Sequence, residues 1–293
     1  MALPLLDIDL PLPEQRTRAT LLASIAELPV TSLTDDSNER WLNGFTWSPN
    51  YVRDPKFGSA LDACGAVDVN GDAMGLSTAF ATAAGFRVFD GVTTSTLNAV
   101  DGAALRAGLE ARSVNWLSWA FARQLATGSA TGAANNLTTA AAGRDPAGAA
   151  YGSAATPLYN AFAILETHLA TRIHNGQGVI HIPPGLLENA VDECSLERDG
   201  DRFYTPLGHL VVADGGYVDM PAPVGEAASA AGEDWIYATG PVFYRMIAPA
   251  VVGGDANQVD IRTNDRTLWI EGYGIVLFEP EIATAVLVSY AKE

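Results

Sequence analysis

The strongest constraint on this chain is the stretch Asp101–Gly128, whose sequence predicts one long helix. Asp101 suits the N-cap, because its carboxylate can accept a backbone N–H that has no partner within the first turn. Gly128 supplies the left-handed conformation with which many helices end. At 1.5 Å per residue the helix would be about 40 Å long, which is comparable with a small domain.

Apolar side chains cover more of this helix than one buried stripe requires. Six of them recur at spacings close to the helical period: Leu105, Leu109, Val114, Leu117, Phe121 and Leu125. Trp116 and Trp119 widen that stripe beyond the usual apolar width. A helix with aromatic side chains on more than one face needs neighbours on several sides, and these can come from the same chain or from other copies of it.

The charge of the chain excludes several classes of function. Among 293 residues there are 34 acidic and 17 basic ones, a net charge of −17, and the only lysines are Lys56 and Lys292. This balance argues against wrapping nucleic acid or docking on an anionic membrane, since both need positive charge. It is compatible with lining a space that DNA fills. No run of eighteen apolar residues predicts a transmembrane helix, and the length suits one large domain or two modest ones.

The cysteines and the first residues indicate a protein of a reducing compartment. Cys64 and Cys194 lie far apart, so no disulfide framework is expected, and the cytoplasm is the natural location. Residues 1–15 lack the basic start of a signal peptide. Prolines interrupt this segment and disfavour helix before them. We expect an extended arm, either a frayed tail or a segment laid over a neighbouring copy.

The other elements are predicted from periodicity and from the positions of glycine and proline. In chain order we expect a short helix at 14–28, the strands of a projecting hairpin at 41–58 and 85–96, a Gly- and Ala-rich loop to 155, a helix at 156–176, a strand at 178–182, a short helix at 183–193, strands within 203–218 and 235–247, and final strands at 258–263, 266–279 and 282–291. The helix after the loop is capped by Thr156 and starts at Pro157. Because helices and strands are mixed without an alternating βαβ rhythm, the fold class is α+β.

The sequence contains no clear catalytic motif. It lacks the phosphate-binding GxxxxGK[ST] and the nucleophile elbow GxSxG, and no pair of carboxylates is placed by spacing for acid–base work. Asp68–Asp72 hints at a calcium loop, but its glycine is misplaced and the last loop position is Ala79 rather than Glu, so a solvated turn is the better interpretation. We therefore expect no catalytic residues, no cofactor and no metal.

The histidines are interpreted as structural residues. There are four of them: His168, His174, His181 and His209. His168 and His174 are six residues apart and do not share a helix face. With Cys194 as the nearby thiol, a metal site is the alternative, but scattered histidines are more often surface or capping groups. His181 lies in an apolar strand, which predicts a buried histidine whose hydrogen bonds are satisfied.

The order of these elements resembles the major capsid protein of tailed double-stranded DNA bacteriophages, the Hong Kong 97 capsid fold, which encapsulin shells also use. The resemblance covers nearly the whole chain and rests on element order and on three local phrases, ARSVNWLSWAFARQLATG, HNGQGVIHIPPGLL and YTPLGHLVVADGGY. It implies self-assembly into the hexamers and pentamers of an icosahedral shell around a DNA genome, in the cytoplasm of a bacterial host. Portal, scaffolding and decoration proteins are the further partners that it implies.

The same resemblance implies a division of the chain into segments. They are an N-terminal arm at 1–45, an extended hairpin loop at 46–98, a peripheral domain at 99–150 with its spine helix at 101–127, an axial domain at 151–250, and a return to the peripheral domain at 251–293. An arm and a hairpin that cannot fold alone would become ordered on neighbouring copies. Head-to-tail contacts of this kind close into rings.

Some capsids of this fold join a hairpin lysine to an asparagine of a neighbour, with a glutamate assisting proton transfer. On the resemblance, Lys56, Asn264 and Glu271 are the candidates, because Asn264 and Glu271 have the family's separation of seven residues. However, Lys56 lies near the base of the expected hairpin, and Asn264 before Asp265 is an ordinary turn residue. The sequence favours a structural turn over a cross-link.

Three other interpretations stay open. An encapsulin-type compartment shares the fold and would hold a protein cargo in place of DNA. A tail or collar component would form rings or tubes. An enzyme would need a cluster of polar side chains, which the sequence does not indicate.

Overall fold

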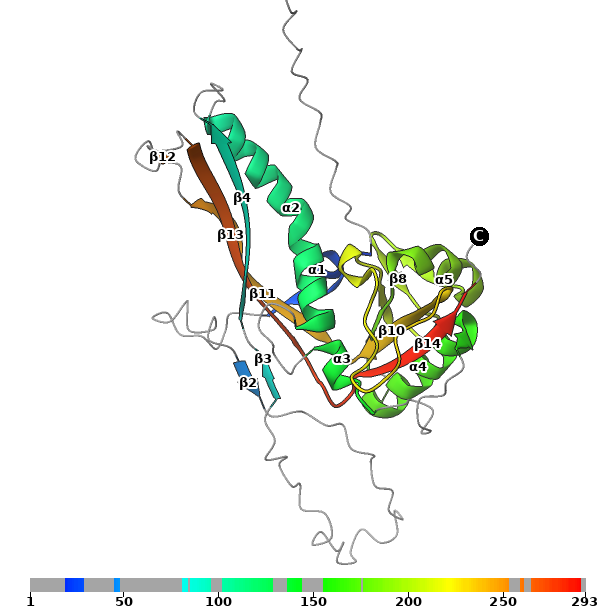
Figure 1. Ribbon diagram of the computed structural model, residues 1–293. Coiled ribbons are helices and arrows are strands. Elements are labelled where there is room, and N and C mark those ends of the chain that lie inside the picture. Colours follow the sequence, from blue (N-terminus) through cyan, green and yellow to red (C-terminus); the bar gives the residue numbers. More distant parts are fainter. Residues whose placement is uncertain are drawn as a thin grey trace, which may run out of the picture.

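The computed structural model describes residues 19–28, 45–47, 81–83, 85–95, 102–128, 136–143, 155–174, 176–252, 259–260 and 265–290. In these ranges the chain forms an elongated part, built from a five-stranded sheet and the long helix α2, and a rounder part around a seven-stranded sheet (Figure 1). A two-stranded ribbon lies beside the elongated part.

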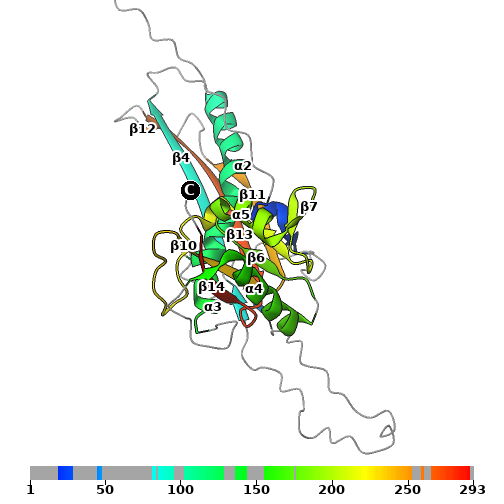
Figure 2. The ribbon, with the colours of Figure 1, turned by 90° about the vertical axis from the view of Figure 1, so that its right-hand side faces the viewer.

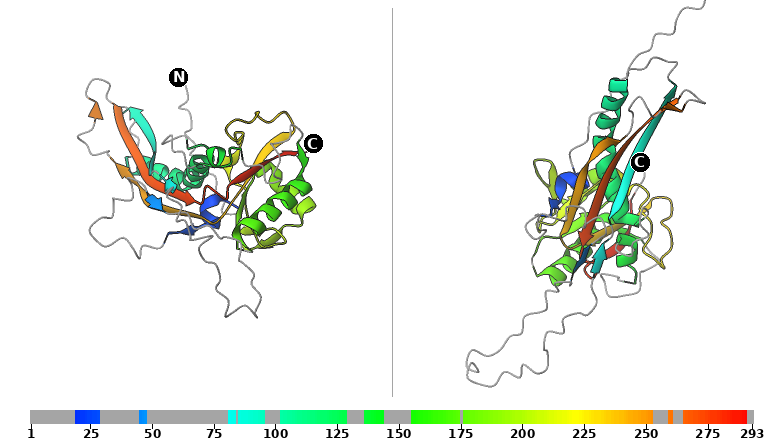
Figure 3. Two further views of the ribbon diagram at one scale, coloured as in Figure 1. Left: turned by 90° about the horizontal axis from the view of Figure 1, so that it is seen from below. Right: turned by 90° about the vertical axis from the view of Figure 1, so that its left-hand side faces the viewer.

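The five-stranded sheet is organised around its longest strand, β13 (Asp265–Phe278). Residues 265–274 of β13 pair antiparallel with β4 (Phe86–Ser95), and residues 269–278 pair antiparallel with β11 (Val242–Val252). Where the two stretches overlap, β4 and β11 flank β13. The short β12 (Val259–Asp260) also pairs with β13, and β1 (Ala26–Glu27) adds to β11 in the parallel direction. Figure 3 shows β4, β13 and β11 side by side.

Helix α2 (Gly102–Thr127) runs along this sheet, which confirms the predicted long helix (Figures 1 and 2). The predicted end is also confirmed, since Gly128 has a φ of 63° and its N–H donates to the carbonyl oxygen of Gln124. The predicted N-cap, Asp101, lies outside the described residues.

The apolar stripe of α2 contacts both sheets. In its first half, Leu109 packs against Leu268 and Ile270 of β13. Its second half enters the largest core of the molecule, to which both sheets contribute: Leu117, Phe121 and Leu125 of α2 with Val212, Tyr217, Trp235, Tyr237, Val276, Phe278 and Ala285. The helix therefore joins the elongated part to the rounder part.

The seven-stranded sheet has the order β5-β14-β10-β6-β9-β8-β7. Its strands are β5 (Thr156–Pro157), β6 (Val179–His181), β7 (Glu197–Asp199), β8 (Arg202–Tyr204), β9 (Leu210–Val212), β10 (Glu233–Thr239) and β14 (Thr284–Ser289). The side chains of its central strands alternate between two cores. In β10, Trp235 and Tyr237 belong to the core shared with α2, whereas Ile236 and Ala238 belong to a second core on the opposite face.

Helices α4 (Leu158–Ile173) and α5 (Leu187–Cys194) cover the second core, and the 3-10 turn η5 (Pro184–Leu186) leads into α5. The predicted stripe of α4 is buried in full: Leu158, Phe162, Leu165, Leu169 and Ile173. The start of α4 was predicted slightly too early, because Thr156 and Pro157 pair with β14 instead.

The predicted helix at 14–28 is wrong in most of its described part. Only α1 (Leu21–Ser24) is helical, Ile25 is extended, and β1 pairs with β11. Leu21 and Ile25 are buried as their spacing suggests. Backbone hydrogen bonds to other elements nevertheless end the helix after one turn. Residues 14–18 lie outside the described residues.

Two further predictions are corrected in part. The outgoing strand β2 (Phe45–Trp47) does pair antiparallel with a returning strand, but that strand is β3 (Ala81–Ala83), and the following β4 pairs with β13. Inside the segment predicted as a loop, the short helix α3 (Leu137–Ala140) forms because the Asn136 side chain accepts the N–H of Thr139.

The chain crosses twice between the two large sheets. The chain passes from β10 to β11 at Gly240–Pro241 and so leaves the seven-stranded sheet for the five-stranded one. It returns from β13 to β14. The predicted division into five segments stays a prediction, but β14 lies in the seven-stranded sheet of the rounder part.

Candidate functional site

The described residues contain no cluster of side chains suited to metal binding. No three histidine, cysteine or carboxylate side chains gather there around a possible metal position, and no described helix has the length and apolar character of a membrane-spanning one. His168 Nε2 is hydrogen-bonded to the carbonyl oxygen of Ile282 at 3.0 Å, and His209 Nδ1 accepts the N–H of Gly178 at 3.1 Å. The suggested calcium loop at 68–79 lies outside the described residues.

His181 is the buried and satisfied histidine that the sequence predicts. Its Nδ1 lies 2.9 Å from the hydroxyl of Tyr217 and its Nε2 lies 3.0 Å from that of Thr239. The single hydroxyl proton of Thr239 donates to the carbonyl oxygen of Gly240, so Nε2 carries the hydrogen and Nδ1 accepts from Tyr217. Burial lowers the pKa of His181 to about 3, which keeps the imidazole neutral.

Cys194, the cysteine within the described residues, is buried. Burial, followed by the nearby charges of Glu193 and Glu166, raises the pKa of Cys194 to about 12. A thiol that keeps its proton at neutral pH is a poor nucleophile, because the thiolate is the reactive form.

The three cross-link candidates are not brought together by the described residues. Lys56 and Asn264 lie outside them. Glu271 lies on β13, where its Oε2 is 2.8 Å from Nε of Arg87 and accepts the hydroxyl of Tyr273 at 3.1 Å. Its carboxylate therefore already has two partners within the chain.

The most distinctive surface lies on the face of the five-stranded sheet turned away from α2. Phe89, Ile247 and Trp269 are exposed there, with exposed fractions of 58%, 39% and 44%. Alternation along the strand explains this, since Leu268 and Ile270 beside Trp269 are buried toward α2. We call this surface the outer face and define it by Arg87, Phe89, Ile247, Trp269 and Glu271.

The aromatic side chains of the outer face are held in place by their neighbours. The ring centroids of Phe89 and Trp269 are 6.1 Å apart, and Cζ of Arg87 lies 5.0 Å from the centroid of the Phe89 ring. Trp269 lies over Gly91, where a Cβ would come within 2.6 Å of its ring. These contacts position an apolar surface without covering it, and exposed apolar patches mark interaction sites.

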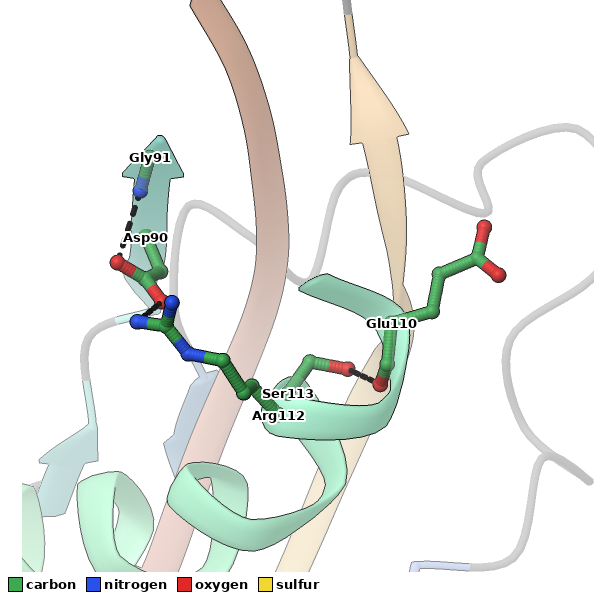
Figure 4. Close-up of polar contacts among 5 residues, drawn as sticks. All are labelled: Asp90, Gly91, Glu110, Arg112 and Ser113. Atoms are coloured by element: carbon green, nitrogen blue, oxygen red, sulfur yellow. Dashed lines mark hydrogen bonds and ion pairs between the residues drawn. The ribbon is translucent and has the colours of Figure 1, made fainter. Parts of the chain in front are cut away.

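Strand β4, which carries Arg87 and Phe89 of the outer face, is also tied to α2. Nη2 of Arg112 lies 2.7 Å from Oδ2 of Asp90, and Oδ1 of Asp90 accepts the N–H of Gly91 (Figure 4). By contrast, the hydroxyl of Ser113 donates to the carbonyl oxygen of Glu110 within α2 itself (Figure 4). Asp90 thus links the helix to the glycine on which Trp269 rests.

A second exposed apolar pair lies where α2 meets the 3-10 turn η6 (Gly215–Tyr217). Trp119 and Val218 are each 50% exposed, and Nη1 of Arg123 donates to the carbonyl oxygen of Val218. This agrees with the expectation that the aromatic residues of α2 occupy more than one face, since Trp116 packs against the cores.

Sequence reasoning placed Phe89 and Trp269 in strands but missed the surface that they form. A signal was available, because side chains alternate between the two faces of a strand. The apolar residues next to each aromatic residue predict that the aromatic ring lies on the other face. The pairing of β4 with β13, which brings them together, has no signal in the sequence.

Comparison with known proteins supports the fold. No family model and no curated protein matches the chain. The capsid of the empty GTA particle matches over 99% of this chain and 96% of that chain, with 14% identity and a TM-score of 0.54, and the capsid of the native GTA particle over 100% and 96%, with 13% and 0.53. A Mycobacterium phage Che8 structure matches over 97% and 96%, with 14% identity and a TM-score of 0.51. The chain has the Hong Kong 97-type capsid fold that its sequence predicts.

Proposed function

We propose that this chain is a major capsid protein, which self-assembles into the icosahedral shell of a tailed bacteriophage and encloses its double-stranded DNA genome. The observation that carries the proposal is the likeness of fold to the capsid subunit of the empty GTA particle, which extends over 99% of the chain. In this proposal the protein has no catalytic activity, and its location is the virion capsid after assembly in the host cytoplasm.

The outer face also supports the proposal, because a single copy of the chain leaves its apolar side chains uncovered. A single copy leaves two aromatic rings and Ile247 exposed on a paired sheet, framed by the ion pair of Arg87 and Glu271. Interfaces between permanent partners bury about 2,000–5,000 Å² and are apolar. A second copy of the chain is the partner we propose for this surface.

Other copies in hexamers and pentamers are the main proposed partners, and portal, scaffolding and decoration proteins would complete the particle. The net charge of −17 suits a shell that surrounds DNA without binding its phosphates. The five segments, from the arm at 1–45 to the return at 251–293, are part of the same proposal.

Electron microscopy of the purified protein tests the proposal. Expressed alone or together with candidate scaffolding proteins, the chain is expected to form closed shells with five-fold vertices. Rings or tubes would point to a tail or collar component, and shells that hold a protein cargo would point to an encapsulin-type compartment. A stable monomer of 30.8 kDa under all these conditions would contradict the proposal.

Substitutions on the outer face test the surface separately. The double variant Phe89→Ser and Trp269→Ser is expected to lower the yield of assembled particles at least about tenfold, since exposed aromatic residues dominate interfaces. Leu207→Ser is the matched control, because Leu207 is 64% exposed but lies on the loop between β8 and β9. Equal yields from both variants would rule out this surface as an assembly contact.

Boiled detergent gels of mature particles test the cross-link. We expect a single monomer band, because Glu271 is already bound by Arg87 and Tyr273 and Asn264 fits an ordinary turn. A ladder of covalent oligomers that disappears in Lys56→Arg would contradict this expectation.

A further inference from the structure

Residues 19–28, which we call the strap, run across the junction between the two large sheets. At one end the N–H of Ala213, just after β9, donates to the carbonyl oxygen of Ala19 at 2.9 Å. At the other end the N–H of Leu28 donates to the carbonyl oxygen of Tyr244 on β11 at 2.8 Å. The strap therefore contacts the seven-stranded sheet where it begins and the five-stranded sheet where it ends (Figure 1).

The strap is anchored at its start and places apolar side chains in the core. Ala19 is fully buried with a φ of 56°, which a residue with a Cβ rarely adopts, and its N–H donates to the carbonyl oxygen of Asp201. Leu21 and Ile25 are buried in the core that both sheets share. A conformation of this kind persists only where the surrounding contacts hold it.

Two buried polar side chains join the strap to α2, and we call them the node: Ser118 of α2 and Asp214, which precedes η6. Oδ2 of Asp214 accepts the N–H of Leu21 at 2.9 Å and the hydroxyl of Ser118 at 2.7 Å. The hydroxyl oxygen of Ser118 in turn accepts the N–H of Leu22 at 3.2 Å. Oδ1 of Asp214 accepts the N–H of Gly216 at 2.9 Å.

The node connects three elements that are far apart in the sequence. It holds the strap, the middle of α2 and the turn η6 of the rounder part through hydrogen bonds to one carboxylate. Ser118 is 6% exposed and Asp214 is 2% exposed, so water does not compete for these bonds. A buried carboxylate with several donors is a costly arrangement that persists where its bonds are made together.

We propose that the node is a positioning device, which locks the strap onto α2 and holds the two sheets at one mutual orientation during shell assembly. This inference rests on the function proposed above. The outer face lies on the five-stranded sheet, and other edges of the subunit lie on the seven-stranded one. The angle between the sheets therefore sets the angle between neighbouring copies, and a shell of uniform size needs that angle to be reproducible.

The variant Ser118→Ala tests the node, and Ser113→Ala is its matched control. Both serines lie on α2 and are almost equally buried, at 6% and 4%, but the hydroxyl of Ser113 donates only to its own helix (Figure 4). Ser118→Ala leaves Asp214 with its bonds to Leu21 and Gly216. It removes the two hydrogen bonds of the Ser118 hydroxyl, one to Asp214 and one from the N–H of Leu22.

The first measurement is hydrogen exchange on unassembled subunits, resolved to single residues. In Ser118→Ala we expect exchange at Leu21 and Leu28 to rise about tenfold or more, although their own acceptors, Asp214 and Tyr244, are intact. Ser113→Ala should leave both amides unchanged. A rise confined to Leu22, whose acceptor is removed, would overturn the proposal.

The second measurement is the distribution of particle diameters in electron micrographs. Ser118→Ala is expected to give a mixture of sizes and open shells, whereas Ser113→Ala should give the uniform shells of the unaltered chain. Uniform shells from Ser118→Ala would overturn the role in assembly. If the unaltered chain forms no shells, the proposed function fails, and the hydrogen-exchange result still decides whether the node locks the strap.

Discussion

At the scale of single residues, the contact between α2 and η6 leaves no space for a methyl group at Gly216. A Cβ there would meet the backbone oxygen of Trp119, the backbone nitrogen of Arg123 at 2.6 Å and Cβ of Ala122 at 2.7 Å. The backbone of a helix cannot move aside as a flexible side chain can. The node and the shared core therefore depend on a glycine at this position.

Gly216→Ala is expected to lower the free energy of unfolding by about 1–3 kcal/mol, because the added methyl overpacks this contact. Gly185→Ala is the control, since a Cβ at Gly185 would have no atom within 4 Å. Its effect should stay within about 0.5 kcal/mol. Urea unfolding of unassembled subunits measures both, and equal effects would contradict the close packing of η6 on α2.

His181 predicts a pH dependence of stability. Its pKa is lowered from 6.5 to about 3 by burial, so above pH 6.5 both the folded and the unfolded chain hold it neutral. Below that pH the unfolded chain binds a proton that the folded chain does not. Stability then falls by up to about 1.4 kcal/mol per pH unit until the folded pKa is reached.

Urea unfolding at pH 7 and pH 5 of the unaltered chain and of His181→Gln measures this effect. The variant loses stability at pH 7, but its further loss between pH 7 and pH 5 should be smaller by about 2 kcal/mol. Identical losses on acidification would show that His181 is protonated in the folded state.

At the scale of elements, α2 carries one glycine that its structure does not require. A Cβ at Gly108 would have no atom within 4 Å, and Gly108 lies inside the helix. Gly108→Ala is expected to raise the free energy of unfolding by about 0.5–1 kcal/mol, because glycine costs more backbone entropy in a helix than alanine.

Gly143→Ala provides a control of opposite sign. Its surroundings are equally open, but Gly143 has a φ of 66°, which alanine adopts with strain. Urea unfolding should show a loss of about 1 kcal/mol for Gly143→Ala. A gain for both variants, or a loss for both, would contradict the backbone argument.

The elements that could be predicted from the sequence are those that carry their own period. The stripe of α4 and the described members of the α2 stripe are local signals, and the structure confirms that these side chains are buried. The strap shows the limit. Its leucine spacing suggests a helix, but the N–H groups of Leu21 and Leu22 find acceptors 193 and 96 residues away, which no local pattern records.

The candidate surface shows the same limit in a different form. Alternation in FRVFDG and TLWIEG predicts that Phe89 and Trp269 each point away from their apolar neighbours. Their contact depends on the register of β4 against β13, where Gly91 lies opposite Trp269. That register pairs two segments that lie far apart in the sequence, and no local pattern records it.

At the scale of the whole molecule, the net charge of −17 makes copies of the chain repel one another. The screening length falls from about 30 Å at 0.01 M salt to about 8 Å at 0.15 M. If the protein assembles as proposed, the rate of assembly should rise about tenfold or more over this range. Light scattering after a salt jump measures it, with potassium chloride and potassium glutamate compared to separate screening from specific ion effects.

An assembly rate that falls with salt over the same range would contradict this expectation, since it would mean that attraction between unlike charges drives association. The same measurement on the Phe89→Ser and Trp269→Ser variant is its control. That variant keeps the net charge and should show the same relative increase from a lower starting rate.

The passage of the chain from β10 to β11 and from β13 to β14 has a mechanical consequence. Each half of the subunit is built from pieces of backbone that continue covalently into the other half. In the proposed shell, tension from tightly packed contents would be carried by these two continuous strands. Such a force would load the polypeptide backbone along its length, and the two halves could not separate without unfolding the strands that connect them.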